Sequence, residues 1–172
     1  MFIGLRELRS NGAIRQREKD LVMRFVIQVV SQGKVEIDGA VRGEIGKGYV
    51  VLIGVAQEDT KEIADKMVSK MLGLRIFPDE NGKTNLSIRD VDGSLLLISQ
   101  FTLYADCRHG NRPGFTTAGK PDMAEPMYEY IIEKCKGEGI PVEQGEFGAE
   151  MKVSLVNEGP FTIVLDSAEI VK

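Results

Sequence analysis

Three small hydrogen-bonding residues, Ser99, Gln100 and Thr102, follow a run of four large apolar residues near the middle of the chain. Such a run is typical of a strand that is buried on both faces. Because side chains alternate along a strand, Gln100 and Thr102 are expected on one face and Ser99 on the other. Polar groups at the end of a rigid strand can orient a reacting group. The alternative is that they only satisfy neighbouring backbone groups.

The familiar hydrolase motifs are missing from the sequence. The only histidine is His109, so neither an HExxH zinc motif nor a second catalytic histidine exists. A Ser-His-Asp triad would have to use His109, and the spacing suggests no partner for it. No G-x-S-x-G elbow is present. We therefore predict no metal site and no cofactor.

A basic, glycine-containing loop is predicted over residues 105–120. Arg108, His109 and Arg112 lie within it and are candidates for binding phosphate groups of an RNA. The alternative is an ordinary solvated loop. Cys107 lies beside Arg108, although a lone loop cysteine is more often structural than reactive.

The elements around these residues predict an α+β domain. Residues 24–30, 34–38, 41–45 and 48–55 are expected to be strands, with a tight hairpin turn at Asp38-Gly39. A helix capped by Asp59 or Thr60 follows, and a second helix is expected to begin close before Pro126. The last two strands, residues 151–157 and 161–166, are separated by Gly159-Pro160. We expect mostly antiparallel β layers with two helices.

Composition limits the setting and the partners. A chain of 172 residues with 42% hydrophobic and 28% charged residues fits one globular domain. Two cysteines are too few for a disulfide framework, and no apolar run is long enough for a membrane helix, which predicts a cytoplasmic protein. The net charge of −4 means that an RNA partner needs a local basic patch.

Residues 1–22 differ in composition from the rest of the chain, mixing five basic with three acidic residues. We predict that they form an extension, from an upstream start codon, to a single domain over residues 23–172. A basic RNA-contacting arm is the alternative.

Three motifs, SQFTLYAD from Ser99, RHGNRPGF from Arg108 and NEGPFT from Asn157, together resemble the D-aminoacyl-tRNA deacylases. The similarity extends from about Met23 to Ser167. It implies a homodimer with a three-layer β/β/α fold. It also implies hydrolysis of the ester between a D-amino acid and tRNA, with mischarged glycyl-tRNA as a further substrate.

The resemblance also assigns roles to residues. Ser99, Gln100 and Thr102 match the family's catalytic segment, which acts largely through main-chain groups with help from the 2′-hydroxyl of the terminal adenosine. Thr102 has been considered a nucleophile in the family, but without an adjacent base we favour a positioning role. Gly159-Pro160 is expected to be a cis peptide that enters the partner subunit's pocket and excludes L-side chains. The full set of predicted substrate-binding residues is Phe101, Met151, Asn157, Gly159 and Pro160.

Some positions depart from the family pattern. Val29 follows Gln28 where the family usually has arginine, Gly114 replaces a common serine, and Phe161 replaces valine. One alternative is therefore a tRNA-binding paralogue with altered catalysis. Another is a small-molecule D-amino acid esterase that uses Thr102 or Cys107.

Overall fold

The computed structural model describes residues 22–171, so the predicted extension of residues 1–22 lies outside the described residues except for Val22. In chain order the elements are β1 (Arg24–Ile37), β2 (Ala40–Ile45), β3 (Gly48–Gly54), α2 (Lys61–Gly73), β4 (Phe77–Pro78), β5 (Thr84–Leu86), β6 (Ser94–Ser99), the 3₁₀ turn η1 (Phe101–Tyr104), α3 (Pro121–Gly137), β7 (Val142–Gln144), β8 (Lys152–Asp166) and α4 (Ser167–Ile170). The predicted α+β class is confirmed. None of the helices in the described range is long and apolar enough to cross a membrane.

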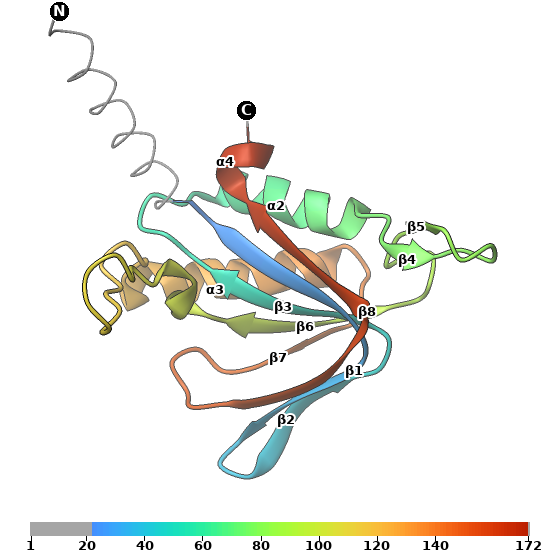
Figure 1. Cartoon of the computed structure of the whole chain (residues 1–172), viewed down its shortest axis with the longest axis horizontal. Helices are drawn as coiled ribbons and strands as arrows, with labels where there is room; N and C mark the ends of the chain where they lie inside the picture. Colours follow the sequence, from blue (N-terminus) through green and yellow to red (C-terminus); the bar gives the residue numbers. More distant parts are fainter. Residues whose placement is uncertain (1–21, 172) are drawn as a thin grey trace, which may run out of the picture.

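The main sheet has the strand order β2-β1-β3-β6-β7 (Figure 1). β3 pairs with the first half of β1 and β2 with its second half, and β8 pairs with both halves of β1 along the opposite edge. β1 is antiparallel to β2, β3 and β8, whereas β3, β6 and β7 are mutually parallel. The sheet is therefore mixed. The Asp38-Gly39 hairpin turn is confirmed, since both residues have positive φ, 51° and 78°, as a tight hairpin requires.

Two apolar clusters occupy the two faces of this sheet. On one face, Phe25, Ile27 and neighbouring strand residues pack against α2 and α3. On the other face, Val30, Val50 and Leu96 pack beneath the first half of β8. The sheet curls enough to bring β2 against β7, where a side chain on Gly43 would lie 3.2 Å from the Gln144 carbonyl oxygen. Helices thus cover one face, and the folded-over sheet covers the other.

Several elements differ from the expectation. The polar segment is not an extended strand, because β6 ends at Ser99, which pairs with Ile53 one residue before β3 ends. Beyond that point the chain turns into η1. Helix α3 begins at Pro121, so the expected start close before Pro126 was wrong; a proline at the first helical position has the φ that a helix needs.

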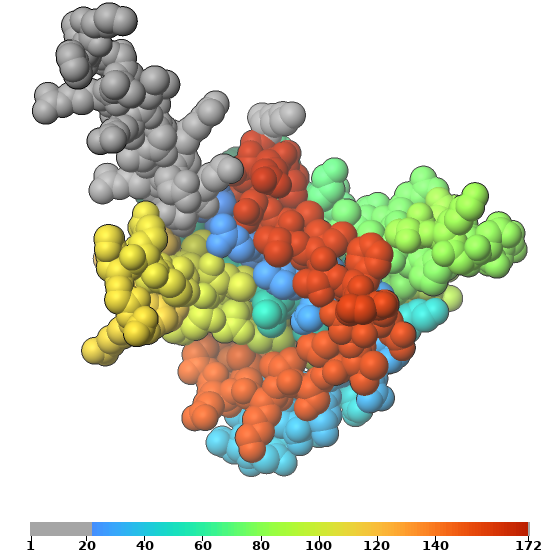
Figure 2. Space-filling view, viewed as in Figure 1, coloured from blue at the N-terminus to red at the C-terminus, as the bar shows by residue number. Residues whose placement is uncertain are grey.

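Further differences concern the C-terminal part. The two predicted last strands form one strand, β8, whose pairing with β1 is interrupted around Gly159-Pro160. The short elements β7 and α4 were not expected. Figure 2 shows the loop after η1 (yellow) and the β4–β5 hairpin (green) on opposite sides of the molecule.

Candidate functional site

A cavity of about 610 Å³ lies at the carboxyl end of β6. Its wall includes the ends of β3 and β6, the start of η1, the start of α3 and the segment between β7 and β8. Four predicted site residues line it: Ser99, Gln100, Phe101 and Met151. Thr102, Asn157, Gly159 and Pro160 do not belong to its lining. The volume is in the range of small-molecule sites.

The 3₁₀ turn η1 carries the predicted catalytic segment beside this cavity. The Gln100 N–H donates to the Ile53 carbonyl over 2.8 Å, which fixes the start of the turn to β3. The Gln100 side-chain amide donates to the Thr102 hydroxyl oxygen. The first N–H groups of a helical turn have no acceptor within that turn. Phe101 lines the cavity, so its N–H group at the start of η1 is a candidate donor to a ligand there, whereas Thr102, the next residue, does not line it.

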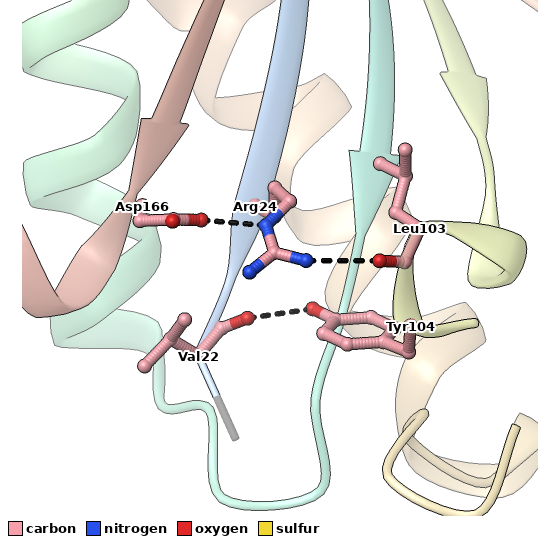
Figure 3. Close-up of polar contacts among 5 residues, drawn as sticks. All are labelled: Val22, Arg24, Leu103, Tyr104 and Asp166. Atoms are coloured by element: carbon pink, nitrogen blue, oxygen red, sulfur yellow. Dashed lines mark hydrogen bonds and ion pairs between the residues drawn. The ribbon is translucent and has the colours of Figure 1, made fainter. Parts of the chain in front are cut away.

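Long-range contacts brace the far end of η1 (Figure 3). One Arg24 Nη atom donates to the Leu103 carbonyl over 2.9 Å, and Arg24 Nε donates to Asp166 over 2.6 Å. The Tyr104 hydroxyl donates to the Val22 carbonyl over 2.8 Å, and burial raises the pKa of this phenol. The turn is therefore held from the start of β1 and the end of β8. No local pattern in the sequence predicts these contacts, which join residues 79 to 142 positions apart.

A buried carboxylate lies in the connection between β3 and α2. Asp59 is 7% exposed, and one of its oxygens accepts from the Ala56 N–H over 2.7 Å. The other oxygen has no hydrogen-bond partner among the described residues. Burial raises the pKa of Asp59 to about 6, against the lowering effect of backbone hydrogen bonds from Ala56 and Met23. Thr60, not Asp59, caps α2 through its hydroxyl.

The Gly159-Pro160 peptide bond is cis, as expected. The dipeptide is exposed and lies in an excursion of β8, where pairing passes from Gln28–Thr162 to Val30–Asn157 and leaves Val29 opposite the gap. Asn157 closes this excursion. Its side-chain oxygen accepts from the Phe161 N–H over 2.7 Å, and its amide donates to the Thr162 hydroxyl over 2.9 Å.

Within one chain, the excursion and the cavity are separated. Ile53, in the cavity wall, pairs with Phe25, whereas the excursion lies opposite Val29. Four residues along a strand correspond to roughly 13 Å, and β8 lies on the far side of β1. The structure therefore does not bring Gly159 and Pro160 together with Ser99 and Gln100.

The basic loop after η1 is only partly arranged around the cavity. Arg108 donates to both carboxylate oxygens of Asp106, at 2.8 and 2.6 Å, and this contact lowers the pKa of Asp106. His109 and Arg112 are exposed, as expected for loop residues. Arg108 and Cys107 line a separate cavity of about 400 Å³. The role of Arg108, His109 and Arg112 in RNA binding stays a prediction.

Sequence reasoning missed several residues of the cavity wall. Phe115 forms an edge-to-face pair with Phe101, at 5.1 Å between ring centres, and Lys120, Phe147 and Ala149 also line the cavity. These residues come from two loops whose positions depend on distant pairing. Within residues 22–171, no three His, Cys, Asp or Glu side chains are placed to hold a metal ion.

Comparisons with known proteins give a consistent result. Residues 26–166 match the family described as D-Tyr-tRNA(Tyr) deacylase. A D-aminoacyl-tRNA deacylase of Thermosipho africanus is 51% identical over 148 residues, which cover 86% of this chain and 99% of the relative. One from Limosilactobacillus reuteri is 52% identical over 144 residues, 84% of this chain and 99% of the relative.

Solved structures agree on the fold. The c-Myc DNA unwinding element binding protein superposes with a TM-score of 0.78 at 38% identity, over 83% of this chain and 97% of that one. A probable eukaryotic D-amino acid tRNA deacylase superposes with a TM-score of 0.76 over 84% of this chain and 99% of that one. Its identity of 18% shows the fold alone.

Proposed function

Since this chain belongs to the D-Tyr-tRNA(Tyr) deacylase family and is a hydrolase acting on the ester bond of D-aminoacyl-tRNA, we propose that the cavity at the end of β6 is its active site. The aminoacyl group enters the cavity, and the terminal adenosine lies at its mouth near Phe101. The observation that carries this proposal is the placement of Ser99, Gln100 and Phe101 in the wall of one cavity. We further propose that the protein acts in the cytoplasm.

The catalytic power comes from main-chain groups. Water attacks the ester carbonyl, negative charge develops on its oxygen, and the N–H groups of Phe101 and Thr102 stabilise that oxyanion. The C–O bond to the ribose then breaks, and the ribose oxygen takes a proton that originates from the water. Gln100 holds the Thr102 hydroxyl, so Thr102 is a positioning group. Neither a carboxylate nor an imidazole lines the described cavity, which fits catalysis by orientation of an activated ester.

A second copy of the chain supplies the chiral filter. An apolar row crosses the sheet from Val164, 54% exposed on β8, through Val26 and Leu52 to Ile98 in the cavity wall. A partner seated on this row can present its exposed Gly159 and Pro160 to the cavity. Main-chain atoms there exclude an L-side chain and admit a D-side chain. Glycine has no side chain to exclude, so glycyl-tRNA is also cleaved.

The dimer is tested by Val164→Glu, with Val41→Glu as the matched control because Val41 is 53% exposed on β2. Sedimentation should show a dimer for the wild type and the control and a monomer for Val164→Glu. The monomer should also lose its preference for D-tyrosyl-tRNA over L-tyrosyl-tRNA. A monomeric wild type with full preference would refute the shared filter.

The location of the active site is tested by filling the cavity. Ala149→Trp places a large ring in the wall, while Ala168→Trp adds the same ring to the exposed helix α4. Only the first variant should lose D-tyrosyl-tRNA hydrolysis, by about 100-fold or more, since the ester no longer fits. Equal activity of both folded variants would place the active site elsewhere.

The alternative of a tRNA-binding paralogue with altered catalysis rests on Val29. This residue is 5% exposed and lies opposite the β8 excursion, so an uncharged valine in place of an arginine affects how the excursion is held. That alternative predicts tRNA binding without ester cleavage. The small-molecule esterase alternative predicts cleavage of simple D-amino acid esters without RNA; Cys107, one of its two nucleophiles, lines a different cavity from Ser99.

A further inference from the structure

The active-site cavity contains one ionisable side chain among the described residues that line it, and that side chain is Lys120. No carboxylate lies in the described wall to neutralise it, and Lys120 is not a member of the ion pairs formed among residues 22–171. The rest of the lining is apolar or carries small polar groups such as Ser99 and Gln100. Lys120 is exposed and borders the cavity, so it is the cationic residue nearest to a ligand bound there among the lining residues.

The backbone of Lys120 is fixed at the cavity wall. Its N–H donates to the Gln57 side-chain oxygen over 3.1 Å, and its carbonyl accepts from the N–H groups of Met123 and Ala124. The preceding residue, Gly119, donates to the Val55 carbonyl over 2.8 Å. The exposed side chain thus starts from a fixed point where α3 begins, at the edge of the cavity. No side chain caps this helix.

The charged groups at the aminoacylated end of tRNA determine which part of the ligand Lys120 can bind. The amino acid carries an ammonium group, which the Lys120 cation repels. The anionic group nearest to the ester is the phosphate on the 5′ side of the terminal adenosine, and lysine binds phosphates as a point charge. A ligand that places the phosphate at Lys120 and the aminoacyl group in the apolar part satisfies both constraints.

We propose that Lys120 binds the 5′-phosphate group of the terminal nucleotide and so sets the direction in which the aminoacyl end enters the cavity. The inference rests on the proposed function of the cavity. Asp122, in the first turn of α3, is exposed and does not line the cavity. Lys120 is therefore the charged residue that a ligand can contact where α3 begins.

The test uses two small substrates, the D-tyrosyl ester of adenosine and the same ester of adenosine 5′-phosphate. They are compared in the full-length wild type, Lys120→Met, Lys120→Arg, and the control Lys83→Met on the exposed β4–β5 hairpin. For Lys120→Met, KM for the phosphorylated ester should rise about five- to tenfold with kcat unchanged. KM for the unphosphorylated ester should not change. Lys120→Arg should restore most of the affinity, and Lys83→Met should behave as the wild type.

The same contact should appear in the salt dependence of tRNA binding. Loss of one phosphate contact should lower the slope of log affinity against log salt concentration by about one for Lys120→Met. Equal changes in KM for both esters, or no change for either, would overturn the assignment of Lys120 to the phosphate while leaving the active site in place. If the wild type cleaves neither the two small esters nor the tRNA ester, both the proposed function and this inference are refuted.

Discussion

Replacing Arg24 by methionine should slow catalysis without weakening substrate binding. Arg24 donates hydrogen bonds to the Leu103 carbonyl and to Asp166 (Figure 3), and Leu103 belongs to the 3₁₀ turn that begins at Phe101 in the cavity wall. Methionine keeps most of the aliphatic bulk and removes only the charged donors. The turn should then shift relative to the ester, since its far end is released.

The size of the effect follows from the contacts. The Arg24 and Asp166 side chains are 23% and 27% exposed, so their ion pair is partly shielded from water. A hydrogen bond to a charged group contributes about 1.5–3 kcal/mol, and partial exposure reduces this to about 2 kcal/mol for the whole substitution. A displacement of about 1 Å at a reacting centre can cost up to about 100-fold in rate. We expect kcat to fall about 10- to 100-fold with KM within about threefold.

The control is Arg89→Met. Arg89 makes the same two kinds of contact, to the Glu138 carbonyl and carboxylate, but both side chains are more than 40% exposed, at 45% and 43%. This variant should lose less than about 1 kcal/mol and keep its activity. Single-turnover hydrolysis and urea unfolding measure both quantities. A stability loss for Arg24→Met with unchanged kcat would refute the positioning role and leave a purely structural one.

Three further substitutions test separate parts of the structure. Asp59→Asn should remove the pH dependence of stability that the Asp59 carboxyl causes. The pKa of this group is raised from 3.8 to about 6 in the folded state, so the folded state binds more protons than the unfolded state between these values. The free energy of unfolding therefore falls as pH rises through this range. The variant should flatten that fall and gain up to about 3 kcal/mol at pH 7; an unchanged pH profile of unfolding would contradict the burial argument. Thr102→Ala should reduce hydrolysis about tenfold but leave it measurable in a folded dimer, whereas complete loss would favour a nucleophile. Gly159→Ala places a side chain at φ 122°, 3.1 Å from the Phe161 nitrogen, which should cost about 1–3 kcal/mol and weaken discrimination between D- and L-tyrosyl-tRNA; unchanged discrimination would count against the filter.

Local sequence signals predicted the elements that local physics decides. Asp38-Gly39 specified its hairpin because glycine readily adopts positive φ. Thr60 caps α2 because its hydroxyl oxygen accepts a hydrogen bond from the N–H of Ile63, only three residues later. The change at Ser99 from strand to 3₁₀ turn had no such signal. It depends on where the neighbouring strand β3 ends, which is a property of long-range pairing.

The same division applies to the site. The motif resemblance identified Ser99, Gln100 and Phe101, which the structure places in one cavity. It did not identify Lys120, whose position depends on the packing of a loop against β3. Nor could it separate Asn157 from the cavity, since the role of Asn157 in closing the β8 excursion is visible only from its contacts with Phe161 and Thr162.

The most direct test is hydrolysis of D-tyrosyl-tRNA and L-tyrosyl-tRNA, matched in tRNA, by the purified full-length protein, with glycyl-tRNA alongside. We expect rapid cleavage of the D-ester and of glycyl-tRNA, with the L-ester spared. Cleavage of both tyrosyl esters would keep the enzyme and reject the filter built on Gly159 and Pro160. No cleavage of any ester by a folded dimer that still binds tRNA would contradict the central claim, and Val29→Arg would then be the first reversion to measure.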